Sequence, residues 1–271
     1  MSIFGDNSPA HESAKNGQVD IEGIQKVTWS VNGDTRLLRG ETQGIITEKY
    51  RLLAHRVRRA RAARPIQTVL VTSSIPGEGK TTVAANLASV LARNGSRVLL
   101  LDADLRAPDL SKALGLTSSL PGLSEVLAGE LSFEQALRCV NPLGLYLLAA
   151  GRPVDNPVPW LEGAVFKNVL ASARQAFEWV IIDSPPLTPV VDAHCLAAMA
   201  DSILLVVRWG FTPREELDQA LGTLAGLPLL GMVLNTFDEP RQKVYYSYYS
   251  RPAPVLSLPA APDDSESQPQ K

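Results

Sequence analysis

Two periods of apolar residues alternate along the middle of this chain. Between residues 65 and 236, short apolar runs with the character of strands alternate with stretches whose apolar positions recur every three or four residues. This alternation is typical of β-α-β units, in which parallel strands form a sheet and helices cover it. The pattern therefore predicts an α/β fold with a doubly wound, mostly parallel sheet and helices on both faces.

The predicted elements follow from those runs. Strands are expected at Thr68–Thr72, Arg97–Leu101, Leu145–Leu148, Trp179–Ile182, Ile203–Val207 and Leu229–Leu234. One helix is expected to follow a glycine-rich loop near residue 80 and to end at about Asn94, with Gly95 as its cap. The other helices are expected at Pro159–Phe177, Asp192–Ala200 and Pro213–Ala225, with two shorter ones near Leu123–Ala128 and Phe133–Cys139.

A further amphipathic helix is predicted before the first of these strands, from Ile46 to Arg64, where Pro65 ends it. Its apolar stripe consists of Ile46, Tyr50, Leu53, Val57 and Ala60. The opposite face is rich in arginine. We expect the stripe to pack on the α/β domain.

Three regions follow from the change in pattern along the chain. Residues 1–44 form a polar N-terminal extension, in which the run Val27–Val31 fits either a strand or a docking segment. Residues 45–240 form the main domain, including the amphipathic helix. Residues 241–271 contain a tyrosine cluster and a Pro/Ala/Ser tail that we expect to be disordered.

Composition and charge narrow the class of protein. The chain has 271 residues, and 45% of them are apolar, enough for a core. A net charge of −2 argues against an overall electrostatic field that would attract nucleic acids or membranes. Two cysteines without metal-site spacing fit a reducing compartment, and no apolar run approaches the ~20 residues of a membrane span. We expect a cytoplasmic protein that reaches a membrane only through a partner.

The glycine-rich loop is the strongest chemical signal. Its sequence, Ser73-Ser-Ile-Pro-Gly-Glu-Gly-Lys-Thr-Thr82, follows an apolar run and precedes a helical pattern, which is the context of a P-loop. In such a loop the lysine reaches the β- and γ-phosphates and the next hydroxyl ligates Mg²⁺. Ser74 stands where the first glycine of the motif is usual, and a plain glycine turn is the alternative. The predicted nucleotide-binding residues are Pro76, Gly77, Glu78, Gly79, Lys80, Thr81 and Thr82.

Carboxylates end two of the predicted strands at the same edge of the sheet. Asp102 and Asp104 follow one strand, and Asp183 follows a later apolar run, Trp179–Ile182. In a parallel α/β sheet this edge holds the ligand. We therefore expect Asp183 to hold the metal, and Asp102 and Asp104 to share work on Mg²⁺ and on an attacking hydroxyl. A helix cap or a turn is the alternative role for each acid.

These motifs together resemble the bacterial tyrosine kinases, or BY-kinases, which have a P-loop NTPase fold. The resemblance covers about Ile46 to Tyr249. The residues that carry it are the loop at 74–81, the Asp-Ala-Asp-Leu-Arg-Ala-Pro sequence at 102–108, the Gly-Arg-Pro-Val-Asp-Asn-Pro sequence at 151–157, and Ile182-Asp-Ser-Pro-Pro186.

The resemblance implies a function that the residue pattern alone does not give. It implies autophosphorylation of C-terminal tyrosines by MgATP, with Lys80, Asp102, Asp104 and Asp183 catalytic and Thr81, Asp102 and Asp183 around the metal. It also implies a role in polymerising or exporting surface polysaccharide. The expected partner is a membrane-embedded polysaccharide co-polymerase whose cytoplasmic tail activates the kinase, with the N-terminal extension as a candidate docking element.

An assembly ATPase of the partition or septum-site type is the alternative. Those ATPases resemble this chain in fold but carry a signature lysine two residues before the middle glycine of the loop, where this chain has Ile75. Asn235, at the end of the last predicted strand, is expected to contact adenine in either class. It therefore does not distinguish them, and a strand-end cap is an equal reading.

The tyrosine cluster favours the kinase. Four of the six tyrosines in the chain, Tyr245, Tyr246, Tyr248 and Tyr249, lie within five positions. The ten residues from Asn235 to Tyr245 span up to roughly 33 Å when extended, enough to reach the nucleotide site of a neighbouring copy. A partner-binding aromatic tail is the alternative.

The predicted N-terminal helix also resembles the Glu-x-x-Arg-x-x-Arg helix that builds ring-shaped oligomers in this family. Glu48 and Arg51 match the motif, whereas Ala54 replaces its last arginine. We expect Glu48 and Arg51 at an interface between copies. A solvated basic face is the alternative, and nucleic-acid binding is not expected because the arginines are not interleaved with aromatic residues. Arg106 is expected to support the acid pair.

Overall fold

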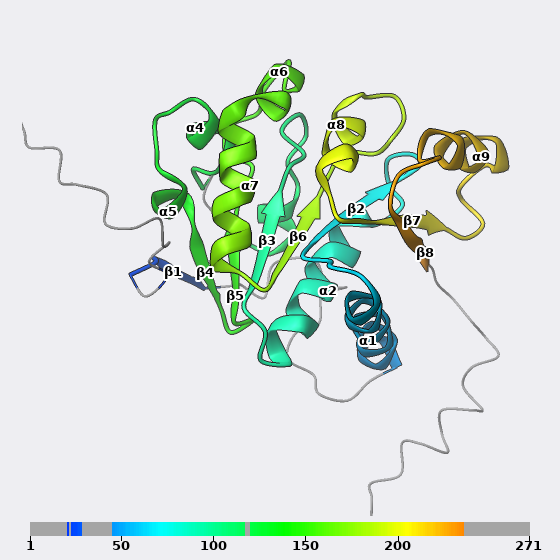
Figure 1. Cartoon of the computed structure of the whole chain (residues 1–271), viewed down its shortest axis with the longest axis horizontal. Helices are drawn as coiled ribbons and strands as arrows, with labels where there is room; N and C mark the ends of the chain where they lie inside the picture. The colour runs from blue at the N-terminus through cyan, green and yellow to red at the C-terminus, as the bar shows by residue number, and fades with distance from the viewer. Residues whose placement is uncertain (1–20, 22, 29–44, 117–119, 236–271) are drawn as a thin grey trace, which may run out of the picture. The chain divides into compact units, whose positions relative to one another are not determined.

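The computed structural model describes residues 21, 23–28, 45–116 and 120–235, and the following description is confined to them. They form an eight-stranded sheet with the strand order β1-β4-β5-β3-β6-β2-β7-β8 (Figure 1). The strands are β1 (Lys26–Thr28), β2 (Thr68–Ser73), β3 (Val98–Asp102), β4 (Arg138–Asn141), β5 (Leu145–Leu148), β6 (Trp179–Asp183), β7 (Ser202–Arg208) and β8 (Leu229–Asn235).

The sheet is parallel except for the β4–β5 pair, which is antiparallel. The four central strands β3, β6, β2 and β7 carry almost uninterrupted apolar sequences, as expected of strands buried on both faces. In the β3–β6 register, Asp102 lies opposite Asp183. The doubly wound, mostly parallel fold predicted from the sequence is confirmed.

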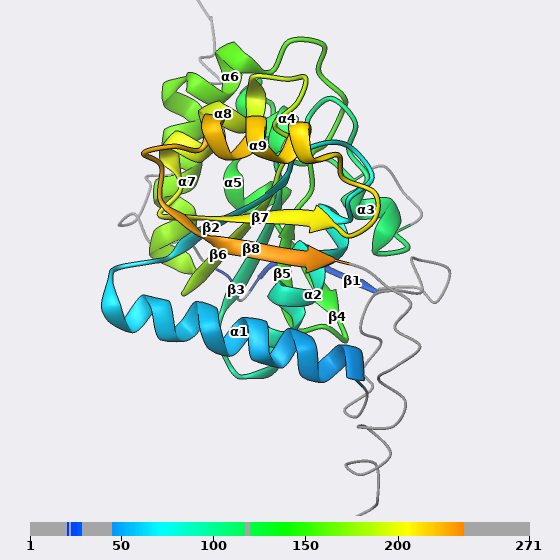
Figure 2. The same ribbon diagram turned by 90° about the vertical axis from the view of Figure 1, so that its right-hand side faces the viewer.

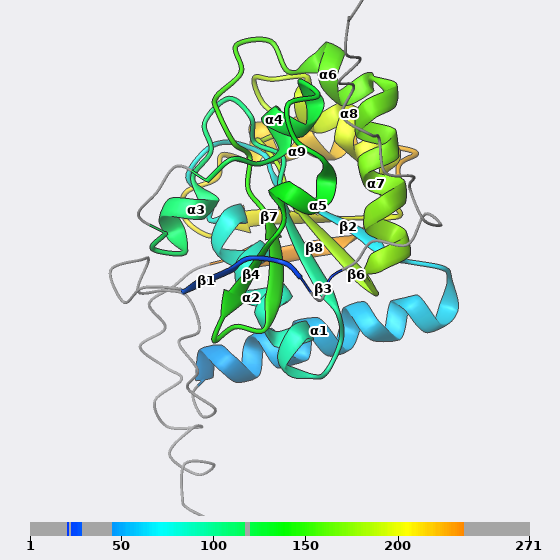
Figure 3. The same cartoon turned by 90° about the vertical axis from the view of Figure 1, so that its left-hand side faces the viewer.

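Helices cover both faces of this sheet. They are α1 (Ile45–Ala63), α2 (Lys80–Arg93), α3 (Leu110–Ala113), α4 (Leu123–Leu127), α5 (Phe133–Ala136), α6 (Val158–Glu162), α7 (Ala164–Ala176), α8 (Asp192–Met199) and α9 (Arg214–Thr223). Residues of α1, α2 and α3 form one apolar core with one face of the sheet, and residues of α4 to α9 form a second core with the other face. Figures 2 and 3 show α1 and α2 on the side opposite α7 and α8.

All six predicted strands are present, and two strands were not predicted as such. The helix expected at Phe133–Cys139 ends at Ala136, and the chain continues as β4. Leu137 has the extended conformation that makes this change of direction. Lys26–Thr28 form β1, which pairs with β4 at the edge of the sheet, while residues 29–44 lie outside the described part.

Two helix predictions also change. The single helix expected at Pro159–Phe177 is divided into α6 and α7 because Gly163 is extended, with ψ at 161°. Four of the five residues of the predicted apolar stripe of α1, Tyr50, Leu53, Val57 and Ala60, pack on the core, and only Ile46 does not. Ile46 is 59% exposed, whereas Ala54 is fully buried together with Val57.

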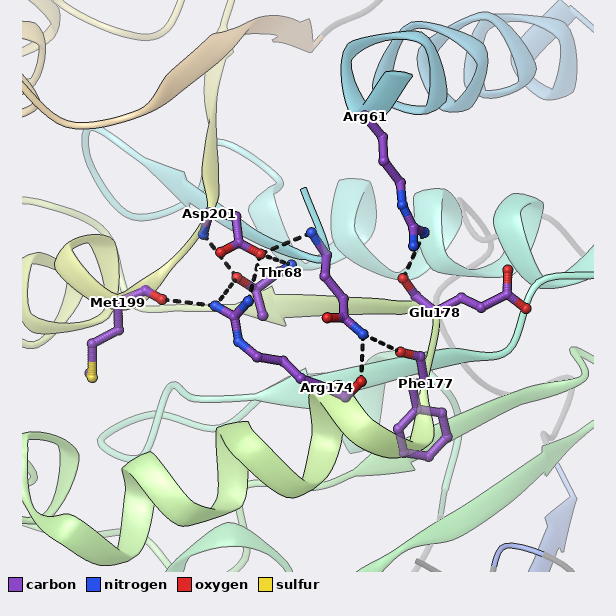
Figure 4. Close-up of polar contacts among 8 residues, drawn as sticks. Arg61, Thr68, Arg174, Phe177, Glu178, Met199 and Asp201 are labelled. Carbon is purple, nitrogen blue, oxygen red and sulfur yellow. Dashed lines mark hydrogen bonds and ion pairs between the residues drawn. The ribbon is translucent and has the colours of Figure 1, made fainter. Parts of the chain in front are cut away.

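A polar network holds the N-terminal ends of β2 and β7 against α7 (Figure 4). Arg174 Nη1 donates to Asp201 Oδ2 at 2.8 Å, and Arg174 Nη2 donates to Thr68 Oγ1 at 3.0 Å. The same Asp201 oxygen accepts the backbone N–H groups of Gln67 and Thr68 at 2.9 and 2.8 Å. The network lies at the edge of the sheet opposite the strand ends that carry the predicted acids.

Within the described residues, no helix combines the length and apolar character needed to span a bilayer.

Candidate active site

The glycine-rich loop connects the end of β2 to the first turn of α2. Gly77 and Gly79 have φ values of 83° and 90°, a region that disfavours residues with a Cβ. A Cβ at Gly79 would lie 2.3 Å from Asn235 Nδ2. These two glycines let consecutive backbone N–H groups point toward a ligand at the N-terminus of α2, where the helix dipole also favours an anion.

Glu78 fastens this loop to the rest of the fold. Its side chain is fully buried, and its carboxylate accepts hydrogen bonds from the Ile75 N–H at 2.8 Å, the Arg208 N–H at 3.3 Å and the Thr212 hydroxyl. The carboxylate is therefore committed to the protein. Of the predicted nucleotide contacts, Glu78 can offer only its backbone.

Asn235 supports the same loop from β8. Its Nδ2 donates to the Glu78 carbonyl at 2.8 Å, and its own carbonyl accepts the Trp209 N–H at 3.1 Å. The turn after β7 thus lies beside the loop, where the Arg208 guanidinium also donates to the Gly77 carbonyl at 3.2 Å. The sequence singled out Asn235 in this turn region but did not reveal Arg208 or Thr212, because no local pattern marks them.

Lys80 points from the start of α2 toward the acids at the end of β3. Its Nζ lies 3.3 Å from Asp104 Oδ2, and both side chains are largely buried. Burial lowers the pKa of Lys80, but the carboxylates of Asp183, Asp104 and Asp102 outweigh this effect and raise it overall. The ammonium charge is therefore secured at this position.

Asp102 and Asp183 are buried side by side at the centre of the sheet. Asp102 Oδ1 accepts the Asp104 N–H at 3.1 Å, whereas Asp102 Oδ2 and Asp183 Oδ1 have no hydrogen-bond partner. Burial, and next the Asp183 charge, raise the pKa of Asp102 well above its usual range. Burial raises the pKa of Asp183 to about 6, with Lys80 and the Thr81 hydroxyl opposing the rise. Buried polar atoms without partners are unusual, and these two oxygens point to a missing ligand.

The oxygens around Asp183 fit Mg²⁺. The Thr81 hydroxyl forms a hydrogen bond with the Asp183 carboxylate, and hydroxyl and carboxylate oxygens are the hard ligands that this ion prefers. Within the described residues, no group of three or more His, Cys, Asp or Glu side chains could hold a metal by itself. An Mg²⁺ ion at Thr81, Asp102 and Asp183 would thus depend on phosphate and water oxygens for its remaining ligands.

Arg106 has a different partner from the one expected. Its Nε and Nη2 donate to the two carboxylate oxygens of Asp192, at 2.6 and 3.1 Å, and its Nη1 donates to the Asp155 carbonyl at 2.6 Å. Asp192, at the start of α8, is buried. Arg106 therefore joins α8 and the segment around residue 155 to the strand end that carries the acids, rather than hydrogen-bonding the acid pair.

The segment at 151–157 has a structural role in this arrangement. The Arg152 N–H donates to Glu125 at 3.2 Å, and the Val154 N–H donates to the Leu105 carbonyl at 2.8 Å. Gly151 has φ at 82°, and a Cβ there would lie 2.1 Å from Glu125 Oε2. The segment packs between α4 and the residues that follow β3, which it holds in place.

The remaining predicted site residues fall into three groups. Glu48 and Arg51 are exposed on α1, where they form an ion pair with each other. Thr82 follows Thr81 in the first turn of α2, and Pro76 is exposed in the loop. Tyr245, Tyr246, Tyr248 and Tyr249 lie outside the described residues. The structure thus brings together the loop, Lys80 and the three acids, and separates Glu48 and Arg51 from them.

Comparisons with known proteins agree on the class of this site. The model of the AAA domain family matches residues 67–227. The tyrosine-protein kinase YwqD of Bacillus subtilis (strain 168) is 38% identical over 72% of this chain and 83% of its own length. The succinoglycan biosynthesis transport protein ExoP of Rhizobium meliloti (strain 1021) is 37% identical over 64% of this chain, which spans only 22% of ExoP.

A solved structure gives the same answer. The kinase domain of the Escherichia coli tyrosine kinase ETK superimposes with a TM-score of 0.71 and 28% sequence identity, covering 76% of this chain and 81% of the ETK domain.

Proposed function

Because this chain belongs to the bacterial tyrosine kinase family, we propose that it transfers phosphate from MgATP to tyrosines of its own C-terminal cluster, Tyr245, Tyr246, Tyr248 and Tyr249. The observation that carries this proposal is the group of buried acids beside Lys80. Two carboxylate oxygens without partners, on Asp102 and Asp183, lie at the centre of the sheet next to a phosphate-binding loop. Such an arrangement suits phosphoryl transfer, which depends mainly on positioning and charge neutralisation.

Each group has a distinct role in the proposed reaction. The backbone N–H groups of residues 77–82 and the Lys80 ammonium would bind the phosphates, and Asn235 would border the base. Thr81, Asp102 and Asp183 would hold Mg²⁺, which neutralises phosphate charge when bound. Asp104 keeps Lys80 in place through their 3.3 Å contact.

Asp102 is the proposed base for the tyrosine hydroxyl. Its raised pKa, caused by burial and by Asp183, makes it a better proton acceptor than an ordinary carboxylate. The Asp104 N–H occupies one lone pair of Asp102 Oδ1, and Oδ2 has no hydrogen-bond partner, so the carboxylate keeps lone pairs both for the metal and for the proton. Lys80 would supply positive charge to the phosphate while the proton moves to Asp102.

The cellular role proposed for this kinase is control of exopolysaccharide or capsule polymerisation and export. The support is the similarity to a relative named for this process, the succinoglycan biosynthesis transport protein ExoP. The chain spans 22% of ExoP. We propose that a membrane-embedded polysaccharide co-polymerase is the partner that activates the kinase and recruits it to the inner face of the membrane. Self-association through Glu48 and Arg51 belongs to the same proposal, as do the domain limits 1–44, 45–240 and 241–271.

The assembly-ATPase alternative is not favoured. Ile75 occupies the place of its signature lysine, and Ile75 offers the buried Glu78 carboxylate a backbone N–H at 2.8 Å. The Ile75 side chain is uncharged, so it cannot provide the positive charge that the signature lysine of such an ATPase contributes to a neighbouring copy.

Phosphosite mapping by mass spectrometry after incubation with MgATP tests the kinase. We expect phosphate on Tyr245–Tyr249 in the wild type and none in Lys80→Met or in a variant with Phe at all four tyrosines. ATP hydrolysis with unmodified tyrosines, even with a candidate membrane activator present, would contradict the proposal and favour the assembly ATPase.

A further inference from the structure

A cationic groove lies between α1 and the C-terminal end of α2, away from the acids. This cavity of ≈ 390 Å³ is lined by Arg51, His55, Arg58, Arg59 and Asn94. Among the described residues, none that lines this cavity carries a carboxylate. Three guanidinium groups thus face one hollow in a protein whose overall charge is −2.

The charge is concentrated on one flank of α1. The helix carries six Lys or Arg residues and a single acid, Glu48, which pairs with Arg51. Arg51, His55 and Arg58 are separated by four and three residues, so they follow one line along the helix. Arg56, also exposed, projects from a different flank.

Neighbouring cations on the two helices are close enough to affect one another. Burial and then the Arg51 charge lower the pKa of Arg93, the last residue of α2. Elsewhere on α1, Arg61 has a defined structural partner, because it donates to the Glu178 carbonyl at 2.9 Å and stacks 4.8 Å from the centre of the Trp179 ring. In the groove, Arg51 is paired with Glu48, whereas the contacts described for His55, Arg58 and Arg59 include no ring, carbonyl or carboxylate. An anion between the helices would offset their mutual repulsion.

The shape and chemistry of the groove favour a phosphate monoester. Arginine presents a planar fork of N–H donors that matches phosphate oxygens, and several such forks can engage one phosphate. A hollow between helices also suits a compact group on a side chain better than the flat surface of a membrane. The groove is separate from the nucleotide loop, because α2 begins at Lys80 and its 14 residues extend about 21 Å before the groove.

We propose that this groove binds the phosphorylated tyrosine cluster of this chain, at Tyr245, Tyr246, Tyr248 and Tyr249. The inference rests on the proposed function, since the kinase supplies the phosphotyrosines. Each phosphotyrosine adds about −1.5 to −2 charges, which the groove cations complement. Unmodified tyrosines carry no such charge, so the groove distinguishes product from substrate.

The tail begins on the side of the domain where α1 lies. Asn235 ends β8, and ten residues of extended chain span up to about 33 Å to Tyr245. In Figures 1 and 2 the end of β8 lies toward the N-terminal end of α1, and Arg51 lies in that half of the helix. The other groove residues of α1, His55, Arg58 and Arg59, follow further along it. The tail of the same chain or of a second copy therefore meets the same groove chemistry.

Peptide binding measured by fluorescence anisotropy tests this inference. The probe is a labelled peptide of residues 241–253 of this chain, made with phosphate on all four tyrosines or on none. The protein is the full chain with Phe at the four tyrosines, so that its own tail does not occupy the groove. The variants are Arg58→Gln with Arg59→Gln, and Arg56→Gln as the matched control on another flank of α1.

The phosphopeptide is expected to bind at least about tenfold more tightly than the unmodified peptide, as several charge-assisted hydrogen bonds would produce. The double variant should lose about tenfold or more of this affinity, whereas Arg56→Gln should keep most of it. Unchanged melting temperatures for both variants establish that the loss does not come from unfolding.

Three results would overturn the inference. They are equal binding of the two peptides, an equal loss in Arg56→Gln and in the double variant, and binding of phosphatidylserine vesicles that requires Arg58 and Arg59 while neither peptide binds. Because the phosphates are introduced by synthesis, the outcome does not depend on kinase activity. If the groove binds the phosphopeptide but the chain never phosphorylates itself, the result would contradict the proposed function and leave this inference standing.

Discussion

Two carboxylates at the ends of β3 and β6 combine deep burial with incomplete hydrogen bonding. Asp102 and Asp183 face each other across adjacent strands, and each keeps one oxygen without a protein partner. Such a pair destabilises the folded chain, because desolvation and like-charge repulsion both act against ionisation. Strain of this kind is typical of sites where function outweighs stability.

Asp102→Asn should therefore separate activity from stability. We expect phosphotransfer to fall by roughly 10²-fold or more, because the amide cannot accept the tyrosine proton. The melting temperature of the ligand-free protein should stay the same or rise, because one buried charge is gone. Rates of tail phosphorylation and thermal unfolding measure the two effects. Asp218→Asn, on the exposed face of α9, is the control, and a variant that loses both activity and stability would contradict this account.

The Glu78 carboxylate should matter through the loop that it holds. In Glu78→Gln the side chain keeps one acceptor oxygen but loses the charge that binds the Ile75 and Arg208 N–H groups and the Thr212 hydroxyl. We expect nucleotide affinity to fall by about tenfold, corresponding to the ~1.4 kcal/mol of one weakened charged hydrogen bond. Titration with a fluorescent ADP analogue measures this loss. Glu162→Gln provides a control at another glutamate, and unaltered affinity in Glu78→Gln would show that the loop keeps its shape without the charge.

At the scale of elements, α7 is joined to β2 and β7 by the Arg174–Asp201–Thr68 network (Figure 4). Burial alone would raise the pKa of Asp201, but Arg174 and the Thr68 and Gln67 N–H groups lower it overall. The ionised form is thus preferred in the fold. Its contribution to stability is present above the ordinary aspartate pKa of about 3.9 and is lost as the pH falls through the lower, folded pKa.

Asp201→Asn should destabilise the protein by about 1–3 kcal/mol at pH 7, because three donors lose a charged acceptor. The difference from the wild type should shrink as the pH falls below about 4. Urea unfolding at both pH values measures the change, with Asp218→Asn again as the control. A difference of the same size at both pH values would rule out the charge as its origin.

The elements that the sequence did not predict owe their form to contacts between distant residues. The apolar spacing of Phe133, Ala136 and Leu137 fits a helix, and Ser132 caps it locally. Only the antiparallel pairing of Arg138–Asn141 with Leu145–Leu148 turns the following residues into a strand. Local periodicity cannot report a pairing of this kind. It predicted the six strands β2, β3, β5, β6, β7 and β8 because their apolar runs are self-contained.

The same limit applies to the site. Lys80, Asp102, Asp104 and Asp183 could be predicted because each lies at the end of a recognisable element. Asp192 and Thr212 could not be predicted, because their importance comes from bonding to residues 86 and 134 positions away. No feature of their own sequence surroundings marks them.

At the scale of the whole molecule, ligand binding and folding should be linked. MgADP at 100 times its dissociation constant should stabilise the wild type by about 2.7 kcal/mol, because it binds only the folded chain. Filling the site also gives the Asp102 and Asp183 oxygens their missing partners. Thermal unfolding with and without MgADP measures this shift. Lys80→Met should remove most of it, while Lys167→Met, on α7, should not; an equal shift in both would place the ligand elsewhere.

The helix α2 connects the two anion sites of this account, with the nucleotide loop at its first residue and the basic groove beyond its last. Because the two sites lie at opposite ends of this helix, a mutation can remove the function of one site and leave that of the other. A strain carrying the Lys80 substitution does not phosphorylate the tail. A strain carrying the Arg58 and Arg59 substitutions phosphorylates the tail, but its groove does not bind the phosphotyrosines. When both alleles are expressed together, they should complement each other only if one copy can phosphorylate the tail of another copy.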